Sequence, residues 1–139
     1  MTDPACIFCK ILNGQIPATK VFQDDACMAF LDIGPVAEGH LLLVSAEHVE
    51  SADRLSPEQA AAMLRSLPAL VRAVRVATGC EGVNVLQNNG RIAGQLVPHV
   101  HFHIIPRKPG DAFHYAWPAG KYPPGRADQL AEAMRKELA

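Results

Sequence analysis

Excess charge of one sign is the feature that this sequence lacks most clearly. Its 139 residues carry 13 Lys and Arg against 14 Asp and Glu, a formal net charge of −1. Such a chain has no overall field that attracts nucleic acid or an anionic membrane, so we expect neither as a partner. Any phosphate group that the protein binds must therefore meet a local cluster of residues.

Long apolar runs and a secretion signal are also missing. The strongly apolar stretches, such as residues 41–44, are far shorter than the roughly 20 residues of a membrane-spanning helix. Residues 1–4 do not begin the basic and then apolar pattern of a signal peptide. These features favour the cytoplasm, where the four cysteines would be reduced thiols or metal ligands rather than disulfides.

The composition that remains, 49% hydrophobic and 19% charged, is typical of one globular domain. We expect residues 1–139 to form that single domain, in the α+β class, because the predicted strands are joined by turns and one long helix rather than by alternating helices. The expected strands are 20–22, 27–32, 40–45, 83–87 and 97–105, and the expected helices are 6–12, 57–78 and 126–139.

The long helix has the clearest local signals. Ser56 can cap its free N–H groups, Pro57 suits the first helical position, and Gln59 can complete a capping box. Pro68 should kink the helix because it lacks an N–H and crowds the preceding turn. Gly79 is the expected stop.

The run of residues 99–103, His-Val-His-Phe-His, carries the strongest functional signal. In a strand, alternation sends His99, His101 and His103 to one face and the apolar residues between them to the other. These imidazoles could form the polar face of a half-exposed strand, or a catalytic zinc site of three histidines. The chemistry favours a third interpretation, nucleophilic catalysis at phosphorus, because a neutral imidazole is a good nucleophile and its phosphorus adduct is reactive. We expect His101 to be the nucleophile, since imidazoles flank it on both sides.

Residues 99–105 resemble the signature of the histidine-triad superfamily, in which three histidines alternate with apolar residues. The resemblance extends over residues 7–107 and includes Ile-Pro-Ala at 16–18 and three further segments, 30–35, 39–44 and 94–95. It implies a five-stranded antiparallel sheet with one long helix and short terminal helices. It also implies that residues 107–139 are a C-terminal tail that varies within the family.

The resemblance implies an enzyme, a nucleotide hydrolase or nucleotidyl transferase. His101 would attack the α-phosphate of a purine nucleotide conjugate, a phosphoramidate or a dinucleoside polyphosphate, and form a nucleotidyl-histidine intermediate. His40 would support the hydrogen-bonding network, and His99 and His103 would complete the catalytic set. Asp32 would bind the ribose hydroxyls. The remaining nucleotide-binding positions would be Asn88, Gln95 and His103 along the ribose and phosphate path, and Phe8, Ile11, Phe30 and Ile33 around the base.

Simpler interpretations stand beside these assignments. Asp32 comes shortly before a glycine and a proline and could begin a turn, and Asn88 belongs to an Asn-Asn-Gly segment that is typical of turns. Phe8, Ile11 and Phe30 belong to types that are more often core than binding pocket. His40, at the start of an expected strand, would be uninformative by itself.

Cys6 and Cys9 form a Cys-x₂-Cys pair, a spacing that lets two thiolates bind one tetrahedral zinc ion. Cys27 and Cys80 stand alone and are best interpreted as small buried hydrophobes. Some members of the superfamily bind zinc through such a pair and two histidines, which here match His48 and His99. The resemblance thus implies a structural Zn²⁺ site. The alternative is two reduced thiols on a short helix.

The sequence departs from the family at residue 96, where a leucine replaces the serine of the Hint branch. That serine can hydrogen-bond a leaving group, so its absence weakens a specific prediction of phosphoramidate cleavage. Residues 104–107 are more similar to bacterial and Fhit-like members. Three tail residues, His114, Tyr115 and Trp117, could reach a substrate or the dimer partner, but packing or loop positions are the expectation. The resemblance also implies a homodimer, while a nucleotide- or zinc-binding regulatory module with little turnover remains the alternative to an enzyme.

Overall fold

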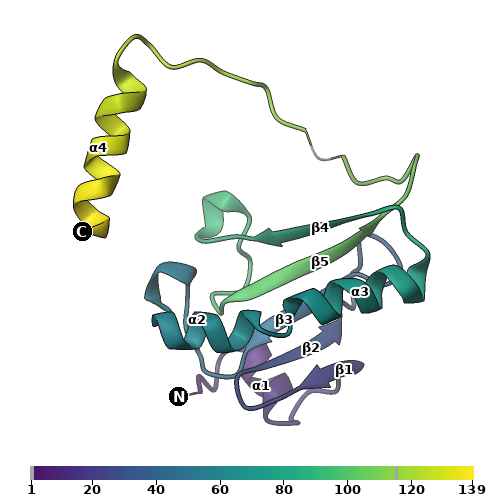
Figure 1. The fold of residues 1–139 in the computed structure, drawn as a ribbon. Coiled ribbons are helices and arrows are strands. Elements are labelled where there is room, and N and C mark those ends of the chain that lie inside the picture. The colour runs from purple at the N-terminus through teal and green to yellow at the C-terminus, as the bar shows by residue number, and fades with distance from the viewer. Residues whose placement is uncertain (1, 115) are drawn as a thin grey trace.

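A computed structural model describes residues 2–114 and 116–139 and contains one five-stranded antiparallel sheet (Figure 1). The strand order is β1-β2-β3-β5-β4, and each strand pairs antiparallel with its neighbours. The strands are β1 (Lys20–Gln23), β2 (Cys27–Leu31), β3 (Leu41–Ser45), β4 (Gly82–Gln87) and β5 (His101–Arg107). The predicted α+β class and five-stranded antiparallel sheet are confirmed.

Two helices, α2 (Pro57–Leu64) and α3 (Leu67–Thr78), cover one face of the sheet (Figure 1). Their buried apolar side chains pack against alternate residues of the strands, because successive side chains of a strand point to opposite faces. This core contains Cys27, Ala29, Leu41, Leu43, Met63, Leu70, Val74, Val100 and Ile104.

The opposite face packs against the short helix α1 (Ile7–Leu12) and forms a second core. The buried members of this core are Cys6, Phe8, Cys9, Ile11, Met28, Phe30, Leu42 and Val44. The register pairs His101 with Val44 and His103 with Leu42 across β3 and β5. Because paired residues share a face, both histidines lie on the α1 side of the sheet.

The predicted long helix is interrupted near Pro68, where the sequence predicted a kink, and consists of two helices rather than one. Helix α2 ends at Leu64, and α3 begins at Leu67 with Pro68 in its first turn. The proline ring would meet the carbonyl group of Leu64 in a continuous helix, so the chain starts a new helix at this point. The predicted ends are confirmed: Ser56 and Gln59 form the capping box, and Gly79 ends α3 in the left-handed conformation.

The predicted strand 97–105 is wrong at both ends, since β5 runs from His101 to Arg107. Pro98 has no N–H for a sheet ladder, and the N–H of His99 closes a tight turn onto the carbonyl of Val97 at 2.8 Å. His99 therefore lies outside the strand, just before its first residue. The three histidines do not form one evenly spaced row on a strand.

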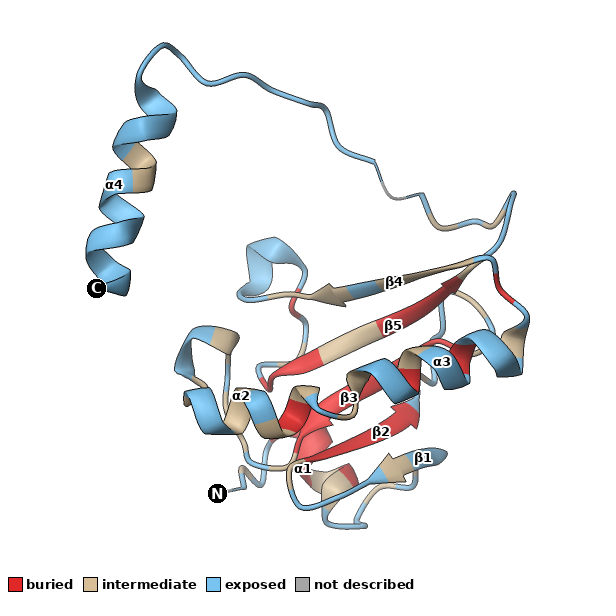
Figure 2. Ribbon diagram, viewed as in Figure 1, coloured by how far each residue is buried: buried red, intermediate tan, exposed pale blue. Residues whose placement is uncertain are grey.

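Beyond β5 the chain runs away from the sheet and ends in α4 (Arg126–Leu138) (Figure 1). This terminal helix has 13 residues and is therefore not short. Figure 2 shows that most of the segment after β5 is exposed, whereas the buried residues concentrate in the sheet and the helices against it. None of the helices in the described part of the chain has the length and apolar content of a membrane span.

Candidate active site

His101 is held so that one ring nitrogen faces the protein interior. Its Nδ1 lies 2.6 Å from the backbone carbonyl oxygen of His99. A carbonyl oxygen can only accept a hydrogen bond, so Nδ1 carries the proton and Nε2 carries the lone pair. Phe8 meets the ring edge to face, with centroids 4.9 Å apart. The side chain is only 6% exposed, and burial lowers its pKa, which favours the neutral imidazole at neutral pH.

His103 is held by a chain of hydrogen bonds that fixes its protonation as well. The backbone N–H of Val36 donates to Nδ1 of His40 at 3.1 Å. The proton of a neutral His40 is then on Nε2, which lies 2.9 Å from Nδ1 of His103 and donates to it. Burial lowers the pKa of His40 and lowers that of His103 to about 4, so both rings are neutral at neutral pH. His103 therefore carries its proton on Nε2, opposite to the arrangement in His101.

Asp32 lies beside this chain and serves a local turn. Its Oδ1 accepts the N–H of Gly34 at 2.9 Å, so the interpretation as a turn residue is confirmed. Its Oδ2 lies 3.7 Å from Nε2 of His40. The carboxylate is partly exposed and retains acceptor positions for a further donor.

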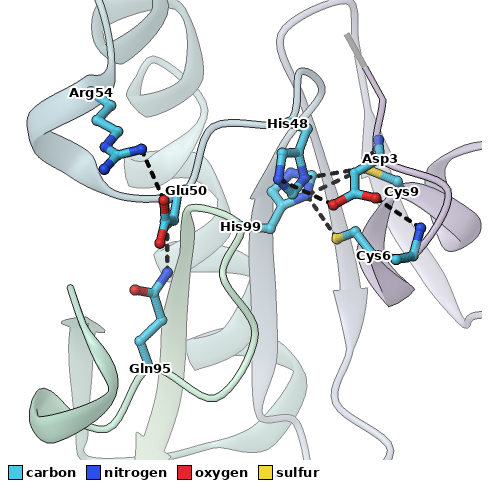
Figure 3. A network of polar contacts seen from close by, with 9 residues as sticks. Asp3, Cys6, Cys9, His48, Glu50, Arg54, Gln95 and His99 are labelled. Carbon is cyan, nitrogen blue, oxygen red and sulfur yellow. Dashed lines mark hydrogen bonds and ion pairs between the residues drawn. The ribbon is translucent and has the colours of Figure 1, made fainter.

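Four side chains that the sequence associates with zinc come together beside α1 (Figure 3). Cys6, Cys9, His48 and His99 each place one ligand atom within 4.8 Å of the other three. Nδ1 of His99 lies 3.3 Å from Sγ of Cys6 and 3.7 Å from Sγ of Cys9. Nδ1 of His48 lies 3.5 Å from Sγ of Cys9.

The donor set and its orientation fit a tetrahedral zinc ion. Nε2 of His99 donates to the carbonyl oxygen of Ser45 at 2.8 Å, so the lone pair of Nδ1 faces the thiols. Asp3 Oδ2 lies 3.8 Å from Nε2 of His48 and is placed to orient that ring in the same way. Two thiols and two imidazoles leave no open position in a four-coordinate site.

Two other metal sites fit the geometry poorly. The first is the group of Asp32, His40 and His103, whose ligand atoms also lie close together. Nε2 of His40 already hydrogen-bonds His103, and a metal bound to it would force the His40 proton onto Nδ1, against the N–H of Val36. The three-histidine zinc site fails because Nδ1 of His101 bonds a carbonyl while Nδ1 of His99 faces the thiols. Among the described residues, His99, His101 and His103 do not form a group of converging ligand atoms.

The residues predicted to line the phosphate path differ in burial and in their contacts. Gln95 is buried, and its amide accepts from the N–H of Gly90 at 2.8 Å and donates to the carbonyl of Glu50 at 2.6 Å. Figure 3 shows Gln95 reaching Glu50, so this side chain shapes the loop before β5. Asn88 lies at the start of the same loop and is half-buried. Leu96 is 77% exposed near its end.

Three of the residues predicted to form the base pocket are buried, and the fourth is exposed. Phe8, Ile11 and Phe30 are buried in the core on the α1 side, which confirms their simpler interpretation as core residues. Phe8 also touches the rings of His99 and His101, so the core reaches the catalytic histidines directly. Ile33, next to Asp32, is 93% exposed. In the tail, His114 and Trp117 are exposed, and Tyr115 lies outside the described residues.

Sequence reasoning missed the groups that orient the histidines. The N–H of Val36 and the carbonyls of Ser45 and His99 are backbone groups, which any residue type except proline at Val36 would supply. The carboxylate of Asp3 is a side chain, but nothing in the sequence near it indicates a partner 45 residues away. No pattern in the sequence could have identified these four groups.

Comparison with known proteins gives the family. A model described as HIT domain matches residues 13–110, more than half of the chain. The chain belongs to the HIT family. The matched range contains His40, His48 and all three histidines of the run, whereas Cys6 and Cys9 precede it.

Individual relatives cover nearly the whole HIT chain. It is 43% identical to adenosine 5'-monophosphoramidase of Schizosaccharomyces pombe over 136 residues, 96% of this chain and 98% of the relative. The crystal structure of a HIT-family member from Bacillus subtilis superposes with a TM-score of 0.93 at 39% identity, covering 97% of this chain and 98% of that one. A HIT family protein from Bacillus anthracis gives a TM-score of 0.93 at 35% identity, covering 99% and 100%.

Proposed function

We propose that this HIT-family protein is a hydrolase or nucleotidyl transferase that cleaves the bond between the α-phosphate of a purine nucleotide and its leaving group. Nε2 of His101 attacks the α-phosphorus, and the leaving group departs with the electron pair of the broken bond. The product is a nucleotidyl-histidine. Attack by water or another acceptor on phosphorus then breaks the phosphorus–nitrogen bond and returns His101.

The observation that supports this proposal most strongly is the hydrogen bond from Nδ1 of His101 to the carbonyl of His99, at 2.6 Å. It leaves the Nε2 lone pair available, as a nucleophile requires. Once Nε2 bonds phosphorus, the ring holds a positive charge, and the same hydrogen bond becomes charge-assisted and stronger. The carbonyl of His99 thus stabilises the nucleotidyl-histidine intermediate more strongly than it stabilises the free enzyme.

His103 has the complementary role in the proposal. With its proton on Nε2, it donates a hydrogen bond to a phosphate oxygen, where negative charge increases during attack. The side chain of Asp32 accepts from the ribose hydroxyls, and exposed Ile33 offers apolar surface for the base. The name of the Schizosaccharomyces pombe relative, adenosine 5'-monophosphoramidase, agrees with this substrate class.

Intact-mass spectrometry tests the proposal with a panel of adenosine phosphoramidates, diadenosine polyphosphates and nucleotide sugars. We expect a transient mass increase of one nucleoside monophosphate, located on the peptide that contains His101. His101→Ala should lose the adduct and roughly 10³-fold or more of the turnover. His114→Ala, on the exposed tail, is the matched control and should retain both. Nucleotide binding without adduct or turnover on any panel member would overturn the enzyme in favour of a regulatory binding module.

We also propose that Cys6, Cys9, His48 and His99 hold a structural zinc ion, which would join the amino-terminal helix to the start of the catalytic strand. When bound, zinc would supply ligand bonds and not a reactive water. Metal analysis should find about one zinc ion per chain in wild type and much less in Cys6→Ala or Cys9→Ala. Cys27→Ala, at a buried cysteine of the other face, is the control and should keep the metal. A metal-free wild-type protein with an unchanged melting temperature after zinc addition would contradict the site.

Finally, we propose a homodimer in the cytoplasm. Among the described residues β4 pairs only with β5, which leaves its outer edge open there, and Val76 on α3 and Val85 on β4 are exposed apolar residues. All four cysteines are free thiols, which agrees with a reducing compartment. Sedimentation equilibrium of the full chain tests the dimer, and a monomer at all concentrations would contradict it.

A further inference from the structure

Four amide side chains lie close together in the chain where β4 passes into the loop before β5: Gln87, Asn88, Asn89 and Gln95. In the described part of the chain, hydrogen bonds engage the amides of Gln87, Asn89 and Gln95 but not the amide of Asn88. Asn88 is half-buried, and its amide keeps two donor and two acceptor positions for a ligand. Three of the amides therefore build the loop, and the fourth remains available.

Asn89 fastens the start of this loop in two directions. Its Oδ1 accepts the backbone N–H of Ala52 at 2.7 Å, which ties the loop to the segment that follows His48. Its Nδ2 donates to Oε1 of Gln87 at 2.6 Å, and Nε2 of Gln87 donates back to Oδ1 at 2.9 Å. Nε2 of Gln87 also donates to the backbone carbonyl oxygen of Asn88 at 3.2 Å. The backbone of Asn88 is thus held by two amides that hydrogen-bond each other.

Gln95 fastens the end of the loop in a similar way. Its Oε1 accepts the N–H of Gly90 at 2.8 Å, and its own backbone N–H donates to the carbonyl oxygen of Gly90 at 3.1 Å. Its Nε2 donates to the carbonyl oxygen of Glu50 at 2.6 Å (Figure 3). Asn89 and Gln95 together therefore connect the loop to residues 50–52 at two points.

The register of the sheet places Asn88 beside the catalytic histidines. Gln87, the last residue of β4, pairs with Phe102 of β5. One residue further along, Asn88 comes opposite His101, and opposite residues share a face of the sheet. Nδ2 of Asn88 lies 3.5 Å from the position that a Cβ on Gly94 would occupy, so the side chain packs against this glycine. The available amide is thus presented on the face where His101 would meet the α-phosphate.

We infer that Asn89 is a positioning residue: by holding the backbone of Asn88, it presents the amide of that residue to an oxygen of the nucleotide's α-phosphate. The inference rests on the nucleotide chemistry proposed for His101 and adds the residue that directs this contact. Asn89 does not act on the nucleotide directly, because its own amide atoms are engaged by Gln87 and Ala52. An amide that is oriented in advance loses less conformational freedom when the nucleotide binds.

Calorimetric titration with adenosine 5'-monophosphate tests the inference through a double-mutant cycle. Asn88→Ala removes the contact with the phosphate and should raise the dissociation constant at least about tenfold. Asn89→Ala should raise it about fivefold, although its side chain touches no nucleotide. Because both changes act through one contact, the double variant should stay within about twofold of Asn88→Ala. Gln23→Ala, at an exposed amide of β1 that accepts from Lys20, is the control and should bind like wild type.

The side-chain amide of Asn88 gives a readout that needs no nucleotide. Nitrogen-15 relaxation of this group should show an ordered side chain in the free wild-type protein and a mobile one in Asn89→Ala. Asn89 lies at the surface, so its replacement should disturb the fold little. Gln87→Ala removes the other amide of the pair and should show the same pattern, which keeps the test decisive if one variant is unstable.

Several outcomes would overturn the inference. Losses that multiply in the double variant would show that Asn89 acts independently of Asn88. A lower melting temperature of Asn89→Ala with unchanged affinity would reduce its role to folding, and an Asn88 amide equally ordered in both proteins would exclude positioning. A wild type that does not bind the nucleotide would also overturn it. The expected pattern without an adduct at His101 would keep the positioning role and overturn the enzyme, whereas an adduct with multiplying losses would do the reverse.

Discussion

Acid is expected to destabilise the protein through its buried histidines, and the contribution of His103 can be isolated. The fold lowers its pKa from 6.5 to about 4 because the ring is buried and because His101 and His40 would repel a positive charge on it. The carboxylate of Asp32 acts in the opposite direction and only partly offsets these effects. The folded state thus favours the neutral ring. Its contribution to stability is complete above pH 6.5 and is lost as the pH falls toward 4.

The size of this loss follows from the shift itself. One pKa unit corresponds to about 1.4 kcal/mol of differential interaction between the two protonation states. A change from 6.5 to about 4 therefore predicts that the unfolding free energy falls by ~3 kcal/mol through His103 between neutral pH and about pH 4. Since a domain of this size has only about 5–15 kcal/mol of stability, the effect is measurable.

Urea unfolding at several pH values isolates the contribution of His103. His103→Asn removes the titrating ring, and the asparagine oxygen can still accept the proton of His40. The difference in unfolding free energy between wild type and this variant should shrink by about 3 kcal/mol from neutral pH to about pH 4. His114→Asn, at an exposed histidine of the C-terminal tail, is the control for histidine content. A difference that does not change with pH, or an imidazole resonance of His103 that titrates near 6.5, would refute the reasoning.

Three further predictions concern the core, the proposed zinc site and the start of the C-terminal tail. Leu43→Ala, at a fully buried residue of the central strand β3, should lower the unfolding free energy by about 3–5 kcal/mol in urea titrations, since the cavity cannot collapse between sheet and helices. Val21→Ala, at a half-exposed residue of β1, is the comparison and should lower the unfolding free energy far less. If zinc occupies the proposed site, its chelation should lower kcat about tenfold with little change in KM, because the carbonyl of His99 would lose its anchor while the substrate contacts remain. A change in KM alone would contradict this coupling. Arg107 donates to the carboxylate of Asp111 and to Oδ1 of Asn84, so Arg107→Ala should speed amide hydrogen exchange over residues 108–113 without affecting the exchange of β3. Equal protection in both proteins would show that the order of residues 108–113 does not depend on Arg107.

The parts of the fold that local signals determine could be predicted from the sequence. Ser56 and Gln59 satisfy the free N–H groups of α2 wherever the helix packs, and Gly79 takes the left-handed conformation that ends α3. Two of the differences from the sequence prediction involve proline. Pro68 separates two helices and Pro98 delays the start of β5, because proline has no N–H for the hydrogen bond that a continuous helix or strand would require at that position.

The site could be predicted only where side chains carry the signal. The spacing of Cys6 and Cys9 indicated a metal pair, while their histidine partners came from the family resemblance, and the structure brings all four side chains together. The four-residue spacing of Leu130, Met134 and Leu138 predicts the helix at 126–139, but an apolar stripe does not say which surface will cover it. The backbone groups that set the ring protonation leave no trace in the sequence, because every residue type offers the same carbonyl.

His99 connects the two halves of the site because its side chain and its backbone face different partners. The imidazole lies beside the thiols of Cys6 and Cys9, and the carbonyl of the same residue accepts a hydrogen bond from Nδ1 of His101. This requires His99 to lie outside β5, which the turn at Pro98 achieves. A metal bound to this residue would therefore hold the group that decides which nitrogen of His101 is the nucleophile. The middle histidine would be activated by the backbone of the first, and the third, oriented through His40 by the N–H of Val36, would present a proton where His101 presents a lone pair.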